Sequence, residues 1–282
     1  MTETIGNPLS LSVDAARATG HYIDAVAHQL GSGDTGEVVL PHVRRLSVGD
    51  LRDVLRKGME DFAASRSDVI FLCLFYPIIG VTLAYMGLHG NLLHLIFPLV
   101  AGFSLIGPVA GTGLYEMSRR RELGLDSNWA TAFSVLKSPN FAAIFVLGCV
   151  LFAIFVVWVI AAKGIWAATL GPEMPTSVRD FLTEVFTTTA GWTMIAVGFG
   201  VGFLFAAAVL TISVVSFPLL LDRPVGLPVA VFTSMRVTAT NPGPIALWGL
   251  IVAVLLAIGS IPIFLGLVVV LPVLGHATWH LY

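Results

Sequence analysis

Apolar runs long enough to cross a bilayer are the feature that most constrains this chain. The first is residues 69–88, VIFLCLFYPIIGVTLAYMGL, and further runs cover 92–117, 141–162 and 192–221. A membrane-spanning helix needs about 20 apolar residues. The last stretch, 244–282, is too long for one span and is interrupted by Gly259, Ser260 and Pro262. We therefore expect two closely linked helices there, at 244–261 and 263–282.

These runs predict an all-α fold, a polytopic transmembrane helical bundle with six spans. The composition agrees, because 56% of the 282 residues are hydrophobic and 11% are charged, whereas soluble domains carry about 25% charged residues. An alternative is five spans with a re-entrant segment within 244–282. Cys73 and Cys149 lie inside apolar runs, so they indicate no disulfide framework.

The charged residues predict the domain organisation and the orientation. Residues 1–40 are rich in Gly, Ser, Thr and Asp and lack a signal-peptide pattern, so we expect a disordered or weakly helical cytoplasmic segment before a membrane domain at 41–282. The chain has 15 Lys and Arg residues. If the N-terminus is in the cytoplasm and the chain crosses the membrane at each predicted span, only Lys163 and Arg179 lie on the outer side. This asymmetry is typical of the positive-inside rule.

Three amphipathic segments between the spans are expected to lie on the membrane. The first covers 50–63, where Leu51, Val54, Leu55, Gly58 and Phe62 recur at helical spacing. The others are 129–136 and a helix that begins after residue 177. They are either ordinary connectors or lipid-sensing helices, and the sequence leaves both open.

A weak parallel internal repeat is also predicted, with units at 92–162 and 192–261. It places Asn140 opposite Asn241 and Gly148 opposite Gly249. Chance placement of Gly and Asn is the competing explanation. Asn241 is further expected to cap a helix that has Pro242 in its first turn.

Ionisable side chains are expected only at the membrane boundary, since no Asp, Glu, Lys or Arg falls in the middle of a predicted span. Such groups are costly in the bilayer and usually mark a transport pathway, so the pattern argues against a proton pump or a carrier of charged substrates. The boundary groups could form an ion-pair collar, dock a partner, or be solvated among lipid headgroups; they are Glu116, Arg119, Arg120, Arg121, Asp222 and Arg223.

The segment GHATWHLY at 275–282 holds two histidines one helical turn apart, His276 and His280. They are weak candidates for haem or metal ligands, because this spacing puts both on one helix face, but no third ligand is close in sequence. An aromatic boundary belt made by Trp279, His280 and Tyr282 is the favoured interpretation.

Small residues four apart predict close helix packing. The pairs are Gly107 with Gly111 and Gly198 with Gly202. GFGVG at 198–202 has no strand before it, so it does not indicate a nucleotide site.

Several segments resemble an uncharacterised family of bacterial integral membrane proteins, from about residue 41 to the end. They are DVLRKGMEDF, FPLVAGFSLIGPVAGTGLYEMSRRRELG, SFPLLLDRPVG and GHATWHLY. The resemblance implies a multi-pass protein of the bacterial inner membrane without an assigned activity, and it supplies no catalytic residues. Some members carry the label cytochrome c oxidase subunit I-like, but that subunit type has more spans and deep histidine ligands that this chain lacks.

From these observations we expect no enzyme activity and no cofactor. The function predicted is an accessory, scaffold or assembly component of a membrane complex, with a respiratory complex as one candidate. A transporter of small solutes or lipids and a haem or metal protein are the alternatives. The expected partners are the lipid bilayer and other membrane subunits, and not nucleic acid.

Overall fold

A computed structural model describes residues 41–89, 92–171 and 177–282, and its described elements are all helical. The predicted segment 1–40 lies outside the described residues. Four helical stretches are long and apolar enough to cross a membrane: 93–122, 141–169, 189–222 and 242–260. Two shorter apolar helices lie at 77–86 and 267–281. The multi-pass helical membrane fold is therefore confirmed, while the count of six spans and the internal repeat stay predictions.

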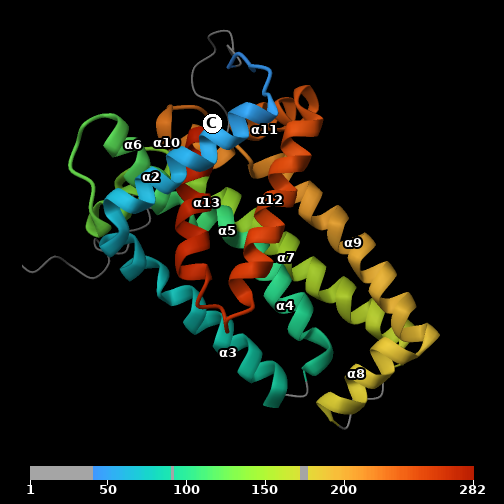
Figure 1. The fold of residues 1–282 in the computed structure, drawn as a ribbon. Helices are drawn as coiled ribbons and strands as arrows, with labels where there is room; N and C mark the ends of the chain where they lie inside the picture. The colour runs from blue at the N-terminus through green and yellow to red at the C-terminus, as the bar shows by residue number, and fades with distance from the viewer. Residues whose placement is uncertain (1–40, 90–91, 172–176) are drawn as a thin grey trace, which may run out of the picture.

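Helix α2 (Val48–Cys73) begins with a capping box, in which the Ser47 side chain accepts a hydrogen bond from the Asp50 backbone and Asp50 returns one. Non-helical backbone angles at Ser65 divide it. Its amphipathic first part crosses one end of the molecule, and the chain then turns into α3 (Phe75–His89) (Figure 1). The predicted amphipathic segment at 50–63 thus lies within α2.

The stretch predicted as one helix at 92–117 is broken into short pieces. They are η1 (Leu93–Leu95), α4 (Ile96–Phe103), η2 (Ser104–Ile106), α5 (Gly107–Ala110) and α6 (Thr112–Glu122). Pro108 stands in the first turn of α5, and because proline lacks a backbone N–H, it favours the start of a helix over its interior. The predicted span at 92–117 thus corresponds to a helical stretch at 93–122 that is long and apolar enough to cross the membrane, and within it the helix is interrupted.

After α6 the chain forms η3 (Trp129–Lys137), a 3-10 helix whose Asn128 side chain caps it, and then the long α7 (Phe141–Thr169). Helix α8 (Val178–Thr187) begins as predicted, with the Ser177 hydroxyl accepting from the Asp180 backbone. It packs on the start of α9 (Thr189–Ser213), at the far end of the molecule from α2 (Figure 1).

The predicted span 192–221 is two helices, α9 and α10 (Ser216–Asp222). The break precedes Pro218, which cannot donate to the carbonyl of Val214. Helices α11 (Leu227–Thr240) and α12 (Pro242–Ser260) follow. The Asn241 side chain makes no cap for α12; it accepts from the Leu46 backbone at 2.7 Å and donates to the Arg44 carbonyl at 3.0 Å. Asn241 therefore occupies the predicted N-cap position with Pro242 in the first turn, but its side chain holds the chain before α2 and does not cap the helix.

The last two helices are joined close to Gly259, Ser260 and Pro262, the residues predicted to interrupt this stretch. Helix α12 ends at Ser260 and α13 (Leu267–Leu281) begins after a turn in which Ile263 and Phe264 have positive φ angles. The two helices run in opposite directions, and the C-terminus lies beside α2 (Figure 1). At 1.5 Å per residue α13 is about 22 Å long, shorter than a bilayer core of about 30 Å. Both a short span and a re-entrant segment fit this length.

Candidate functional site

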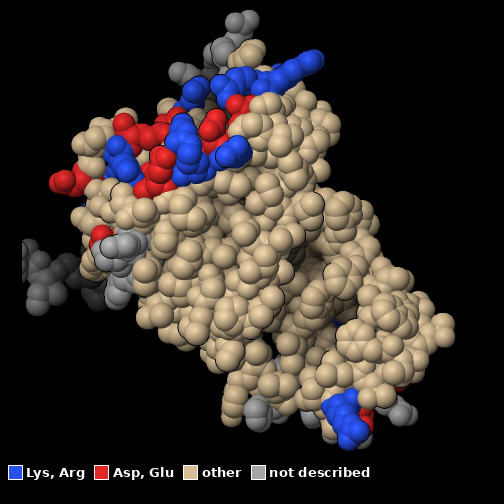
Figure 2. Space-filling model, in the orientation of Figure 1, with Lys and Arg blue, Asp and Glu red and all other residues tan. Residues whose placement is uncertain are grey.

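Charged side chains gather at the end of the molecule that carries α2 and α6, and we call this the charged end (Figure 2). The surface between it and the α8 end shows almost no charge in this view (Figure 2). The charged end is therefore the candidate site, because it is where the described chain concentrates groups that can pair, titrate or bind.

Asp61 of α2 contacts three side chains at this end. Its carboxylate accepts from the Ser118 hydroxyl at 2.6 Å and contacts the His280 ring through Nε2 at 2.9 Å. Arg121 forms an ion pair with the other carboxylate oxygen at 3.0 Å. Burial raises the pKa of Asp61, but the hydrogen bonds from His280 and Ser118 lower it by more, so the pKa of this carboxyl lies below its ordinary value.

Both histidines of the C-terminal helix belong to this network. His276 is buried, and its Nδ1 lies 2.7 Å from the Ser118 hydroxyl oxygen. Because Ser118 gives its single proton to Asp61, His276 Nδ1 must donate to Ser118. His280 contacts Asp61 through Nε2 and Glu122 through Nδ1 at 3.2 Å, so only a ring protonated on both nitrogens donates to both carboxylates. The network joins α2, α6 and α13.

This cluster contains serine, histidine and aspartate, but its order is not that of a nucleophilic triad. In a triad the histidine lies between the serine and the carboxylate, whereas here Ser118 lies between His276 and Asp61. Ser118 is also 1% exposed, so a substrate cannot reach its hydroxyl. The geometry fits a structural clamp on the C-terminal helix.

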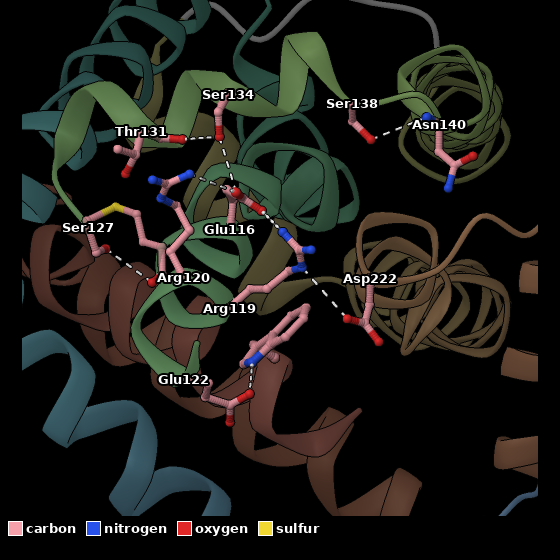
Figure 3. Close-up of polar contacts among 12 residues, drawn as sticks. Glu116, Arg119, Arg120, Glu122, Ser127, Thr131, Ser134, Ser138, Asn140 and Asp222 are labelled. Atoms are coloured by element: carbon pink, nitrogen blue, oxygen red, sulfur yellow. Dashed lines mark hydrogen bonds and ion pairs between the residues drawn. The ribbon is translucent and has the colours of Figure 1, made fainter. Parts of the chain in front are cut away.

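A second cluster surrounds Glu116 on α6 (Figure 3). Arg119 pairs with Glu116 at 3.2 Å and with Asp222 of α10 at 3.7 Å. Arg120 lies 3.8 Å from Glu116, and the Ser134 hydroxyl of η3 donates to Glu116 at 3.2 Å. The boundary charges singled out from the sequence thus connect α6 with α10 and η3, and they are not simply solvated among headgroups.

The remaining members of the predicted boundary set pair as follows. Arg121 contacts Asp61, as above, and Arg223 lies 3.6 Å from its neighbour Asp222. Tyr282 donates to Asp222 at 3.0 Å. Burial and this hydrogen bond raise the pKa of Tyr282 to about 12.

The aromatic boundary belt needs correction. Trp279 is 6% exposed and donates its indole N–H to Glu122 at 3.0 Å, and the His280 side chain is 7% exposed. Both lie inside the protein because α2 and α6 cover this end of α13, whereas Tyr282 is only partly buried, with 37% of its surface exposed. Among the described residues no group of three or more His, Cys, Asp or Glu side chains is arranged to hold a metal ion.

The packing glycines also differ from expectation. A Cβ at Gly202 would lie 3.1 Å from Trp158, so this glycine does pack against α7, and the three atoms nearest to a Cβ at Gly111 belong to Tyr115 of the same helical stretch. A Cβ at Gly107 or Gly198 would meet nothing within 4 Å in the described chain, so these two make no close helix contact there.

A closer approach occurs at Gly58 of α2, which sequence reasoning assigned only to an apolar face. A Cβ there would lie 2.7 Å from both the Ala277 Cβ and the Val273 carbonyl oxygen. The absence of a side chain therefore lets α2 lie directly against α13.

Sequence reasoning also missed Asp61, although a signal was present. Asp61 follows Val54 by seven positions and Gly58 by three, so it falls on the apolar face of the amphipathic helix. A carboxylate on such a face needs a buried partner. Its partner His280 is 219 residues away in sequence, and nothing local identifies it.

The comparisons with known proteins bear on the middle of the chain. No curated protein and no solved structure matches it. A family model does match, over α4 to α10, which includes Glu116, Arg119 and Asp222 but neither Asp61 nor the two C-terminal histidines. The resemblance to an uncharacterised membrane protein family is confirmed, and the match carries no oxidase label: residues 96–222 are similar to the family described as "Predicted integral membrane protein (DUF2189)".

Proposed function

We propose that this chain is a non-catalytic accessory or scaffold component of a membrane complex in the bacterial inner membrane, with its charged end in the cytoplasm. The observation that carries the proposal is the distribution of ionisable groups. The buried carboxylates of the charged end, Asp61 and Glu116, contact arginine, serine or histidine side chains of the same chain. Such pairing fixes helices relative to one another, which supports a structural role for these groups.

The spans supply surface for a partner at the far half of the molecule. On α9, Phe199, Phe203 and Leu204 are each more than 60% exposed. A Cβ at Gly198 or Gly200, beside them, would meet nothing within 4 Å in the described chain. Small residues allow the backbones of two membrane helices to approach closely. We place the contact with another membrane subunit on this face of α9.

The partner is tested by purification in mild detergent after cross-linking in native membranes, with mass spectrometry of every protein retained. We expect a specific membrane subunit to co-purify with the wild-type chain and to be lost from Gly200→Leu. Gly164→Leu on α7 is the matched control, because a Cβ there also meets nothing within 4 Å. Recovery of a lone species from cross-linked membranes contradicts the scaffold role.

Orientation is tested separately with single cysteines in a chain whose Cys73 and Cys149 are replaced by alanine. A membrane-impermeant maleimide added to intact cells should modify Arg179→Cys on α8 and leave Arg56→Cys on α2 unmodified until the cells are opened. The reverse pattern would place the charged end outside.

A further inference from the structure

A groove of about 500 Å³ lies between α5, α6, η3 and α7. Its inner wall is formed by buried apolar side chains, among them Cys73, Leu114 and Ile144. The volume falls within the range of about 300–1,000 Å³ that is usual for small-molecule sites. The inner wall is apolar, so it favours an apolar occupant.

The mouth of the groove is lined by exposed apolar side chains. Phe145 and Phe152 line it from α7, and Phe133 and Leu136 line it from η3; all four side chains are more than half exposed. Because α7 is long and apolar enough to span a membrane, its exposed Phe145 and Phe152 side chains are placed to contact lipid chains. Lipid chains surround the opening at high concentration, and they are the apolar molecules that can enter it directly.

A positive charge lies where the groove approaches the charged end. Lys137 ends η3 directly after Leu136 and is exposed. No ion pair joins Lys137 to a carboxylate among the described residues, whereas Arg119 and Arg120 are both engaged by Glu116. Lys137 is thus placed to contact an anionic group whose apolar part occupies the groove.

We propose that this groove is a binding site for one anionic phospholipid of the leaflet at the charged end, with an acyl chain along α7 and the headgroup phosphate at Lys137. The proposal stands independently of the accessory role. A bound lipid would fill the space between η3 and α7, since these elements otherwise leave apolar side chains around an open cavity, and it would make the position of η3 sensitive to membrane composition.

The test is native mass spectrometry of the full chain, released from detergent containing equal amounts of phosphatidylglycerol and phosphatidylcholine. We expect the wild-type chain to retain one phosphatidylglycerol. Ala110→Trp adds an indole to an exposed alanine that lines the groove, so lipid retention should fall to background. Ala153→Trp is the control, because Ala153 is exposed on α7 outside the groove.

Lys137→Gln keeps the test decisive if Ala110→Trp fails to fold, because this surface change leaves the groove intact. It should reduce the preference for phosphatidylglycerol about fivefold, as expected for one lysine near an anionic surface. Lys163→Gln, at the other end of α7, should leave it unchanged. Equal retention by Ala110→Trp and Ala153→Trp would overturn the proposal, as would equal effects of the two lysine variants. A dimer that Ala110→Trp abolishes without changing lipid retention would also overturn it, by showing a second copy in the groove.

Discussion

The two ends of this molecule are held together in different ways. At the charged end, α2 lies against α13, Asp61 contacts three other side chains, and α10 is buried from Ser216 to Leu221. Away from the charged groups, α12 presents Leu250, Val254 and Ile258 outward, and only 17% of its most apolar stretch is buried within the chain. Apolar surface gains little by leaving lipid for protein. The contacts between side chains that fix the helices relative to one another are therefore concentrated at the charged end, and the apolar spans keep much of their surface outside the core.

Among the variants considered, Asp61→Ala is expected to lower the free energy of unfolding the most. It leaves the buried Ser118 and His280 side chains without their shared carboxylate, and each buried donor left without an acceptor costs about 1–3 kcal/mol. The measurement is the free energy of unfolding in mixed micelles. Asp53→Ala on the same helix should change it by less than about 0.5 kcal/mol, because that side chain is 66% exposed. Similar losses for the two variants would show that the charged end is not organised by Asp61.

Gly58→Val should cause the second-largest loss of unfolding free energy. Its Cβ would overlap the Ala277 Cβ and the Val273 carbonyl, and overpacking of this kind costs about 1–3 kcal/mol. Gly164→Ala, where a Cβ meets nothing within 4 Å, should instead be neutral or stabilising by up to about 1 kcal/mol. The same unfolding measurement checks both. A neutral Gly58→Val would mean that α2 and α13 can separate without loss.

Tyr282→Phe should lower the free energy of unfolding by less than either of these variants. It removes the hydrogen bond to Asp222 at 3.0 Å at the edge of the charged end, a loss of about 0.5–1.5 kcal/mol. Hydrogen exchange of the last turn of α13 should increase while that of α9 stays unchanged. An equal increase in both helices would show that the two halves of the molecule are coupled more tightly than their contacts indicate.

The two ends also differ in how far the sequence predicts them. Local patterns predict several of the apolar helices well: α7 follows from one uninterrupted run, the end of α12 follows from Gly259, Ser260 and Pro262, and Ser177 marks the start of α8. At the charged end the elements are broken near Pro108 and Pro218, and the contacts join residues far apart in the chain. GHATWHLY is a recognisable segment, but its histidines are interpretable only when Asp61 is placed beside them. Pairing between distant charges depends on tertiary geometry, which no local pattern encodes.

The smallest expected effect is an acid-dependent loss of stability that distinguishes the two ends without removing any side chain. Because the folded-state pKa of Asp61 lies below its ordinary value of 3.8, the unfolded state binds the proton more readily. The stabilisation from this carboxylate is therefore complete well above pH 3.8 and is lost as the pH falls through the folded-state pKa. Unfolding free energies between pH 6 and pH 3 should decline in the wild type, and the decline should be shallower in Asp61→Asn, which cannot titrate.

Asp50 also has a lowered pKa, caused by its hydrogen bond from the Ser47 backbone, so Asp50→Asn is the necessary control for this comparison. If Asp50→Asn removes the slope and Asp61→Asn does not, the acid sensitivity belongs to the start of α2, and the buried network does not set the stability of the charged end.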